Sequence, residues 1–314
     1  MKRFFALLLC VFLLLSFAAC GSSEKDIPTT QPAVTIPVTE PAPTVAPTET
    51  PEVVPAVPVV MDNTTLVDNN AVTFTIVKTQ ISDHAGMQLH VNCVNKTEST
   101  LVFSWDMVSV CGYMYDPLWS VEVAAGKSAN SIIELDTYAL ENMGVLSVDE
   151  ISFTLRIFDS ENWMSEPVLD EAFTIYPTGL NADTISLPQR PVNPYDTVII
   201  DDENVSFVIA SASESGSSRY TLSVYLQNKT DRNLMYSWDL VSVNGIMLDP
   251  FWASSVAAGK NACSEINFYR SDLEANGIQE ISEIEFTLIV SDYDNWEAGN
   301  LLEKTFTYRA ESVG

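Results

Sequence analysis

Two acidic loops carry the oxygen-rich side chains that a hard metal cation needs. The loops lie 133 residues apart, and each has two carboxylates and an asparagine before a tryptophan: Asp159, Glu161 and Asn162 in one, Asp292, Asp294 and Asn295 in the other. Ca²⁺ takes about six to eight oxygen ligands of this kind. The spacing lacks the glycine and the distal glutamate of an EF-hand, so a solvated hairpin tip explains the same residues. Calcium therefore stays one alternative, and no other cofactor is expected.

Tryptophans form a second candidate site. Trp105 and Trp238 fall on the apolar phase of alternating segments, which indicates core packing. The other four lie in turns or loops, where an indole can either stack on a sugar ring or partner surface, or close the end of the core. We predict these four as candidate ligand contacts: Trp119, Trp163, Trp252 and Trp296.

Side chains for nucleophilic or zinc chemistry are sparse. The chain has only two histidines, His84 and His90, and both align with serines of the second half of the chain, Ser217 and Ser223. A triad or a zinc site would thus exist in one half only. Paired carboxylates of the glycosidase type arise by chance among 42 acidic residues. We predict no catalytic residues and no enzyme, with an envelope hydrolase or metal-dependent enzyme as the alternative.

Three cysteines follow residue 20, and none has a cysteine as its counterpart in the other half: Cys93, Cys111 and Cys263. Cys93 falls on an apolar phase and is expected to be a core thiol. The sequence leaves open whether Cys93 and Cys111 are bonded to each other, and fold stability is not expected to depend on such a bond.

The first 20 residues indicate the compartment. Lys2 and Arg3 precede an apolar run over 4–17, which is too short for a comfortable membrane span, and Ala18-Ala19-Cys20-Gly21 follows. This segment resembles the signal of bacterial lipoprotein precursors, with phenylalanine at position 17 where leucine is usual. The resemblance implies a signal peptide over 1–19, lipid attachment at Cys20, and anchoring at the extracytoplasmic face of the cell membrane.

A proline- and threonine-rich segment follows and extends to residue 60. Nine prolines recur every two to five positions between 28 and 58. Proline lacks a backbone donor and fixes φ, so this composition favours polyproline II over a helix or a sheet. Residues 20–60 are expected to form a linker, either a stiff stalk or a flexible spacer.

Net charge excludes one class of partner. With 42 acidic and 15 basic residues, the formal charge is -27. Such a field repels polyanions, so nucleic acid is not an expected partner.

An internal repeat accounts for the remaining chain. Residues 65–176 align with 198–309 without a gap, and 44 of the 112 positions are identical. Identity is concentrated in 95–127, with 20 of 33 positions, which suggests that this block does more than fill volume. The expected domains are repeat 1 over 61–177, a linker over 178–197 that would leave the repeats semi-independent, and repeat 2 over 198–314.

Apolar residues alternate with polar ones in segment after segment of both repeats, for example at Val72, Phe74 and Ile76. This period is that of half-buried strands. Asn244-Gly245 predicts a two-residue hairpin turn, and Ser271 to Glu274 predicts a capping box on a short helix that ends at Gly277. The fold class is therefore all-β: two tandem antiparallel β-sandwiches, for which we predict an immunoglobulin-like topology.

Several motifs recur in both repeats, and in repeat 2 they are Asn228-Lys229-Thr230, Tyr236-Ser237-Trp238-Asp239, Val243-Asn244-Gly245, Asp249-Pro250-Phe251-Trp252 and Ala257-Ala258-Gly259-Lys260. In these motifs the chain resembles uncharacterised Gram-positive cell-surface lipoproteins with duplicated immunoglobulin-like domains. That resemblance implies little about activity.

We therefore expect a lipid-anchored binding or adhesion-type protein that presents two acidic modules to a protein, a glycan or a cell-wall component. Two linked weak sites gain avidity, which favours binding. An envelope enzyme and a purely structural surface spacer are the alternatives.

Overall fold

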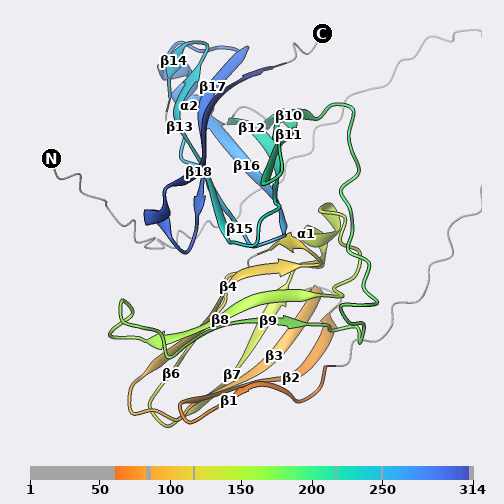
Figure 1. Cartoon of the computed structure of the whole chain (residues 1–314), viewed down its shortest axis with the longest axis vertical. Coiled ribbons are helices and arrows are strands. Elements are labelled where there is room, and N and C mark those ends of the chain that lie inside the picture. The colour runs from red at the N-terminus through yellow and green to blue at the C-terminus, as the bar shows by residue number, and fades with distance from the viewer. Residues whose placement is uncertain (1–60, 83–85, 116, 216–217, 249, 311–314) are drawn as a thin grey trace, which may run out of the picture. The chain divides into compact units, whose positions relative to one another are not determined.

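The fold is described from a computed structural model of the chain, over residues 61–82, 86–115, 117–215, 218–248 and 250–310 (Figure 1). The predicted signal peptide, Cys20 and the proline-rich linker lie outside these residues. Within the described residues, no helix has the length and apolar character that a bilayer crossing requires.

Repeat 1 consists of two antiparallel sheets. The first has the order β1-β2-β3-β7, and the second has the order β5-β4-β8-β9 with β6 paired to β4. Their strands are β1 (Thr64–Asp68), β2 (Val72–Ser82), β3 (Gly86–Asn95), β4 (Leu101–Val110), β5 (Tyr113–Met114), β6 (Ser120–Val123), β7 (Ser128–Leu135), β8 (Ile151–Asp159) and β9 (Leu169–Ile175). A short helix, α1 (Thr137–Asn142), follows β7.

Repeat 2 has the same arrangement 133 residues later. One set of strands runs β10-β11-β12-β16, and the other runs β14-β13-β17-β18 with β15 paired to β13. Its elements are β10 (Thr197–Asp201), β11 (Val205–Ser215), β12 (Arg219–Asn228), β13 (Leu234–Val243), β14 (Ile246–Met247), β15 (Ala253–Val256), β16 (Asn261–Tyr269), α2 (Arg270–Ala275), β17 (Glu283–Asp292), η1 (Trp296–Ala298) and β18 (Asn300–Arg309). The predicted all-β fold of two sandwich domains is confirmed.

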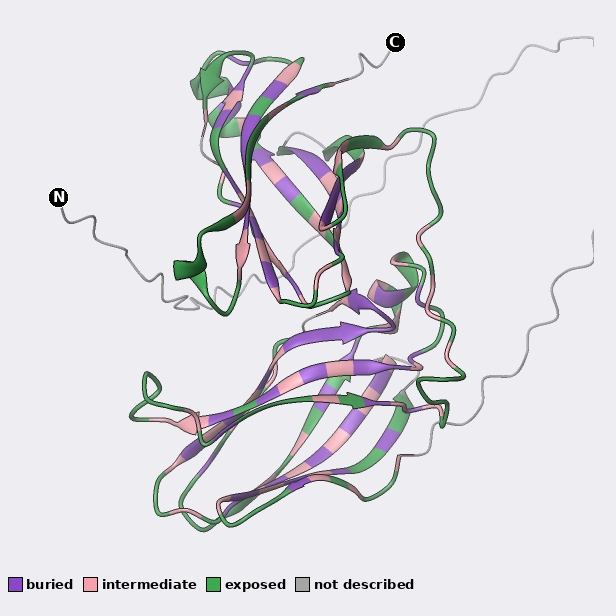
Figure 2. Ribbon diagram, in the orientation of Figure 1, coloured by how far each residue is buried: buried purple, intermediate pink, exposed green. Residues whose placement is uncertain are grey.

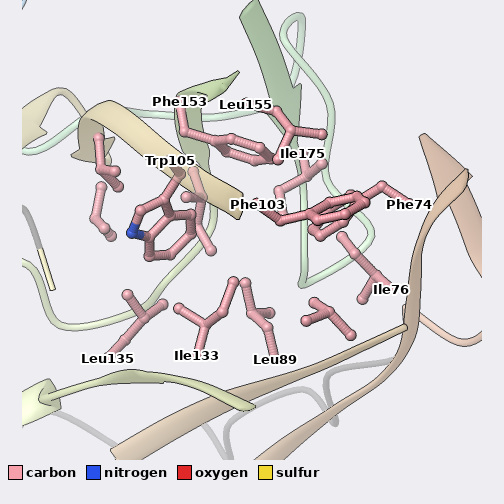
Figure 3. Packing of buried hydrophobic residues seen from close by; sticks show 14 of the residues in the cluster. Phe74, Ile76, Leu89, Phe103, Trp105, Ile133, Leu135, Phe153, Leu155 and Ile175 are labelled. Atoms are coloured by element: carbon pink, nitrogen blue, oxygen red, sulfur yellow. The ribbon is translucent and has the colours of Figure 1, made fainter. Parts of the chain in front are cut away.

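Each repeat has its own apolar core between its two sheets. Strand β3 alternates buried and half-buried positions along its whole length, as the period of two requires (Figure 2). The predicted inward residues Phe74, Leu89 and Phe103 are at most 2% exposed, and they lie together with Trp105 and Phe153 in the first core (Figure 3).

An aspartate supports a bulge at the same place in both repeats. The pairing of β4 with β8 shifts register between Asp106 and Ser109, and Met107 has a positive φ of 50°. The Asp106 carboxylate accepts the backbone N–H of Met107 at 2.7 Å. Asp239 does the same for the next residue of β13, which explains why the aspartate recurs.

Of the predicted hairpin turn and the predicted helix cap in repeat 2, the structure has the turn but not the cap. Asn244 and Gly245 have φ of 51° and 80° between paired Val243 and Ile246, so the predicted hairpin is confirmed. The prediction of a capping box is wrong, because α2 already begins at Arg270 and no side chain caps its N-terminus. Ser271 therefore lies inside the helix, where its hydroxyl contacts Asp272.

A buried asparagine makes several hydrogen bonds within the segment in which the two repeats are most alike, residues 95–127 and their counterparts in repeat 2. The Asn228 amide donates to the carbonyls of Arg232, Val256 and Ala257 at 2.6, 2.9 and 3.1 Å. Its oxygen accepts the backbone N–H and the hydroxyl of Thr230. Asn95 makes the corresponding bonds in repeat 1, so the recurring block is a structural network of turns.

The two repeats also contact each other. Strand β16 pairs with β5 in parallel through Asn261 and Tyr113, which joins strands of both repeats into one sheet. The linker between the repeats contributes Arg190, whose guanidinium lies 5.0 Å from the centre of the Tyr225 ring and binds Asp196 through two hydrogen bonds.

Candidate functional site

The two acidic tryptophan loops connect the last two strands of each repeat. In the first loop, the Asp159 carboxylate accepts the backbone N–H groups of Glu161 and Asn162 at 2.9 and 3.2 Å. These hydrogen bonds, led by the one from Glu161, lower the pKa of Asp159. The local turn therefore fixes Asp159 and leaves Glu161 and Asn162 exposed.

The second loop repeats this turn with additional support. The Asp292 carboxylate accepts the N–H groups of Asp294 and Asn295 at 3.0 and 2.9 Å, and its other oxygen lies 3.2 Å from the Arg232 guanidinium. The Asp294 carboxylate accepts the side-chain amide of Asn233 at 3.0 Å. A short 3-10 helix, η1, then carries Trp296 outward.

Two of the four predicted contact tryptophans lie on the surface. Trp163 is 47% exposed and Trp296 is 77% exposed, at equivalent positions of the two repeats. Next to Trp163, Met164 is 81% exposed. Both indoles can therefore be reached from solvent, as a ligand contact requires.

The other two tryptophans belong to the cores. Trp252 is only 6% exposed, and its indole N–H donates to the Ser264 hydroxyl at 3.1 Å. Trp119 packs against the first core and donates to Ser131 in the same way. Both indoles pack in or against a core, which was the alternative to ligand contact. The candidate contacts therefore narrow to Trp163 and Trp296.

The acidic loops show no assembled metal centre. Among the residues that the structure describes, no group of three or more histidine, cysteine or acidic side chains is placed to hold a metal ion. The first aspartate of each loop is already engaged by backbone N–H groups. Calcium binding by Asp159, Glu161, Asn162, Asp292, Asp294 and Asn295 stays a prediction, in which backbone and water oxygens would supply the remaining ligands.

The two buried thiols are poorly suited to chemistry. Cys93, Cys111 and Cys263 are all unpaired, so Cys93 and Cys111 are not bonded to each other. Burial raises the pKa of Cys93 to about 12, and burial also raises the pKa of Cys111. Such thiols are poor nucleophiles at neutral pH. His84 lies outside the described residues.

Hollows beside the two short helices offer little for small-molecule chemistry. One, of about 220 Å³, lies against Leu140 and Leu146 and has a mainly apolar lining. The other, of about 280 Å³, lies against Phe268 and Leu273. Neither hollow includes residues of the tryptophan loops.

Comparison with known proteins leaves the function open. No family model matches the chain, and no curated protein matches it. Among solved structures, an exo-chitosanase, CsxA of Amycolatopsis orientalis, is similar at 13% identity and a TM-score of 0.23, over 74% of this chain and 26% of that one. A β-D-mannosidase of Dictyoglomus thermophilum is similar at 14% identity and a TM-score of 0.21, over 69% of this chain and 21% of that one. The chain thus spans about a quarter of the first and a fifth of the second.

Proposed function

We propose that this chain is a lipid-anchored, extracytoplasmic binding protein whose two acidic β-sandwich modules each engage a ligand through an exposed tryptophan loop. The observation that carries the proposal is the exposure of Trp163 and Trp296. Four other tryptophans of the two repeats pack into or against the cores, so the chain has sites for buried indoles and leaves these two outside.

The chemistry beside each indole suits a glycan. Glu161 and Asn162 next to Trp163, and Asn295 next to Trp296, are exposed oxygen- and amide-bearing side chains that can bind sugar hydroxyls while the ring stacks on the apolar face of a pyranose. The formal charge of -27 opposes an anionic polymer. We therefore propose a glycan of neutral or positively charged sugar units.

Anchoring is supported by the resemblance of residues 1–21 to lipoprotein precursors. Its test is the distribution of the protein between the membrane and the medium. Cys20→Ala is expected to remove the lipid and release the protein from the membrane fraction. Equal membrane retention of Cys20→Ala and the unchanged chain would contradict the anchor.

Binding is tested by sedimentation with insoluble polysaccharides: cellulose, chitin, chitosan and peptidoglycan. Trp163→Ala/Trp296→Ala is expected to lose retention on whichever polysaccharide binds the unchanged chain. Leu118→Ala/Phe251→Ala is a matched control, because these residues are also equivalent in the two repeats and are 84% and 91% exposed. The control pair is expected to bind normally. Equal retention of both double variants would contradict the proposed site.

A further inference from the structure

The contact between the two repeats uses two different surfaces. Repeat 1 contributes the hairpin that joins β4 to β5, which we name the plug. Repeat 2 contributes the edge of β16 at Asn261 and the turn before it, which contains Ala257 and Lys260; we name this surface the socket. The backbone N–H of Asn261 in the socket donates to the Gly112 carbonyl of the plug at 2.8 Å, and Tyr113 of the plug becomes 1% exposed.

Apolar and ionic contacts complete this junction. Met114 of the plug packs against the second core, and its sulfur lies 3.3 Å from the backbone nitrogen of Ala257. Lys260 of the socket binds Glu150 beside the plug at 2.8 Å, with the two side chains only 19% and 9% exposed. A shielded ion pair of this kind selects one relative position of its two surfaces.

Because the repeats are copies, each surface exists twice. Gly112 and Met114 of the plug, and Glu150 beside it, recur in repeat 2 as Gly245, Met247 and Glu283. The socket residues Ala257 and Lys260 recur in repeat 1 as Ala124 and Lys127. One junction inside the chain thus leaves one plug, on repeat 2, and one socket, on repeat 1.

The second plug and the second socket are open among the described residues. Strand β14, the counterpart of β5, is the last strand of its sheet, and β7, the counterpart of β16, is the last strand of its own. Met247 is 60% exposed and Ile246 is 39% exposed. Unpaired strand edges with exposed apolar residues invite pairing with another chain.

Charge complementarity is kept in this second pair of surfaces. Lys127 is exposed and forms no ion pair within the described residues. Glu283 holds Arg309 at 3.1 Å on the open surface, where an ion pair contributes little and is readily exchanged. Glu285, the counterpart of Ser152, adds a second carboxylate beside the plug.

We propose that the plug of repeat 2 docks on the socket of repeat 1 of a second copy of this chain, reproducing the internal junction between molecules. The two surfaces differ, so the contact is head-to-tail and generates rows or rings of molecules. The free socket has Asn92 in place of Tyr225, and therefore lacks the ring on which Arg190 stacks in the internal junction. The contact between two molecules is therefore weaker than the internal junction, so assembly needs a high concentration of the chain, either in solution or on a membrane surface.

A disulfide trap tests the predicted register. Tyr113 and Asn261 are Cα partners in the internal junction, and their counterparts are Ile246 and Ser128. The full chain carrying Ile246→Cys/Ser128→Cys is oxidised in the envelope of the cells that produce it. We expect species of two, three and more chain masses, whereas each single variant stays at one. Tyr113→Cys/Asn261→Cys is the matched control, because its bond closes within one chain.

Charge reversal tests the ion pair without new cysteines. The full chain, extracted in detergent, is measured by sedimentation velocity over a range of concentrations. Lys127→Glu and Glu283→Lys are each expected to weaken self-association by about tenfold or more. A mixture of the two restores it, because every contact between one variant and the other then pairs opposite charges.

The two measurements together decide the proposal. Unchanged association of Lys127→Glu, or a mixture that associates no better than its components, overturns it. If the control pair forms its disulfide within one chain but no species of two or more chain masses appear, that result also counts against the proposal. Where the two disagree, the sedimentation of the mixture is decisive, because that result depends on the charge match and not on local cysteine geometry.

Discussion

Replacing the buried Asn228 by alanine should destabilise repeat 2 strongly. Its side chain is 1% exposed and joins the Thr230 turn to the carbonyls of Val256 and Ala257. Alanine removes the hydrogen bonds that Asn228 makes to the Val256 carbonyl and from the Thr230 N–H, and a buried group left unpaired costs about 1–3 kcal/mol. We expect the free energy of unfolding to fall by about 3 kcal/mol.

Thermal and urea unfolding, followed by near-ultraviolet circular dichroism, measure this loss. For a domain of this size, about 3 kcal/mol corresponds to a fall in melting temperature of about 10–15 °C. Asn95→Ala should cost a similar amount in repeat 1, because Asn95 makes the same bonds to Thr97 and to the Val123 carbonyl. The repeats are in contact, so both transitions are recorded for each variant.

Asn130→Ala serves as the control. The Asn130 side chain is exposed and accepts one hydrogen bond, from the Asn92 amide at 2.8 Å. Its loss is expected to change stability by less than about 0.5 kcal/mol. If Asn228→Ala cost no more than Asn130→Ala, the turn network would not be the reason for the recurrence of this block, and the reasoning would be refuted.

Further predictions concern a core indole, a turn, an ion pair and the anchor. Trp252→Ala should cost about 3–5 kcal/mol in urea unfolding, and a loss below about 1 kcal/mol would place its ring outside the core. Gly245→Ala, at a φ of 80°, should cost about 1 kcal/mol, and no loss in the same assay would show that the turn tolerates a side chain. The Arg190 guanidinium holds the pKa of Asp196 below its usual value, so this pair contributes stability above about pH 4 that is lost as the pH falls further. Asp196→Asn should flatten that part of the pH profile, and an unchanged profile would refute the assignment. Mass spectrometry of the mature chain should find a lipidated N-terminal Cys20, and an unacylated start at another residue would contradict the anchor.

The sequence predicted the strands well because each one has a polar and an apolar face. The alternation at Val72, Phe74 and Ile76 leaves only one side of β2 able to face the core, and all three are at most 2% exposed. The turn at Asn244-Gly245 could also be predicted from the sequence, since few pairs of residues adopt two consecutive positive φ values. Both features depend only on residues that are close together in the sequence.

Features that depend on long-range packing were harder to predict. Trp119 and Trp163 both follow turns in the sequence, yet Trp119 packs on the core and Trp163 is 47% exposed. One signal was available: Trp119 and Trp252 each lie 12 residues before a serine, Ser131 and Ser264, that accepts the indole N–H. The junction between the repeats had no local signal, because Met114 and Met247 are the same residue at equivalent positions, yet Met114 packs against the other repeat and Met247 is 60% exposed.

The most direct test of the central claim is a binding isotherm on the polysaccharide that retains the unchanged chain. Trp163→Ala and Trp296→Ala each remove one exposed indole, and together they remove both. If the two modules bind one polymer, each single variant should weaken binding by about 10²-fold, through lost avidity, and the double variant should abolish it. Isotherms that coincide for the unchanged chain and the double variant would contradict the account.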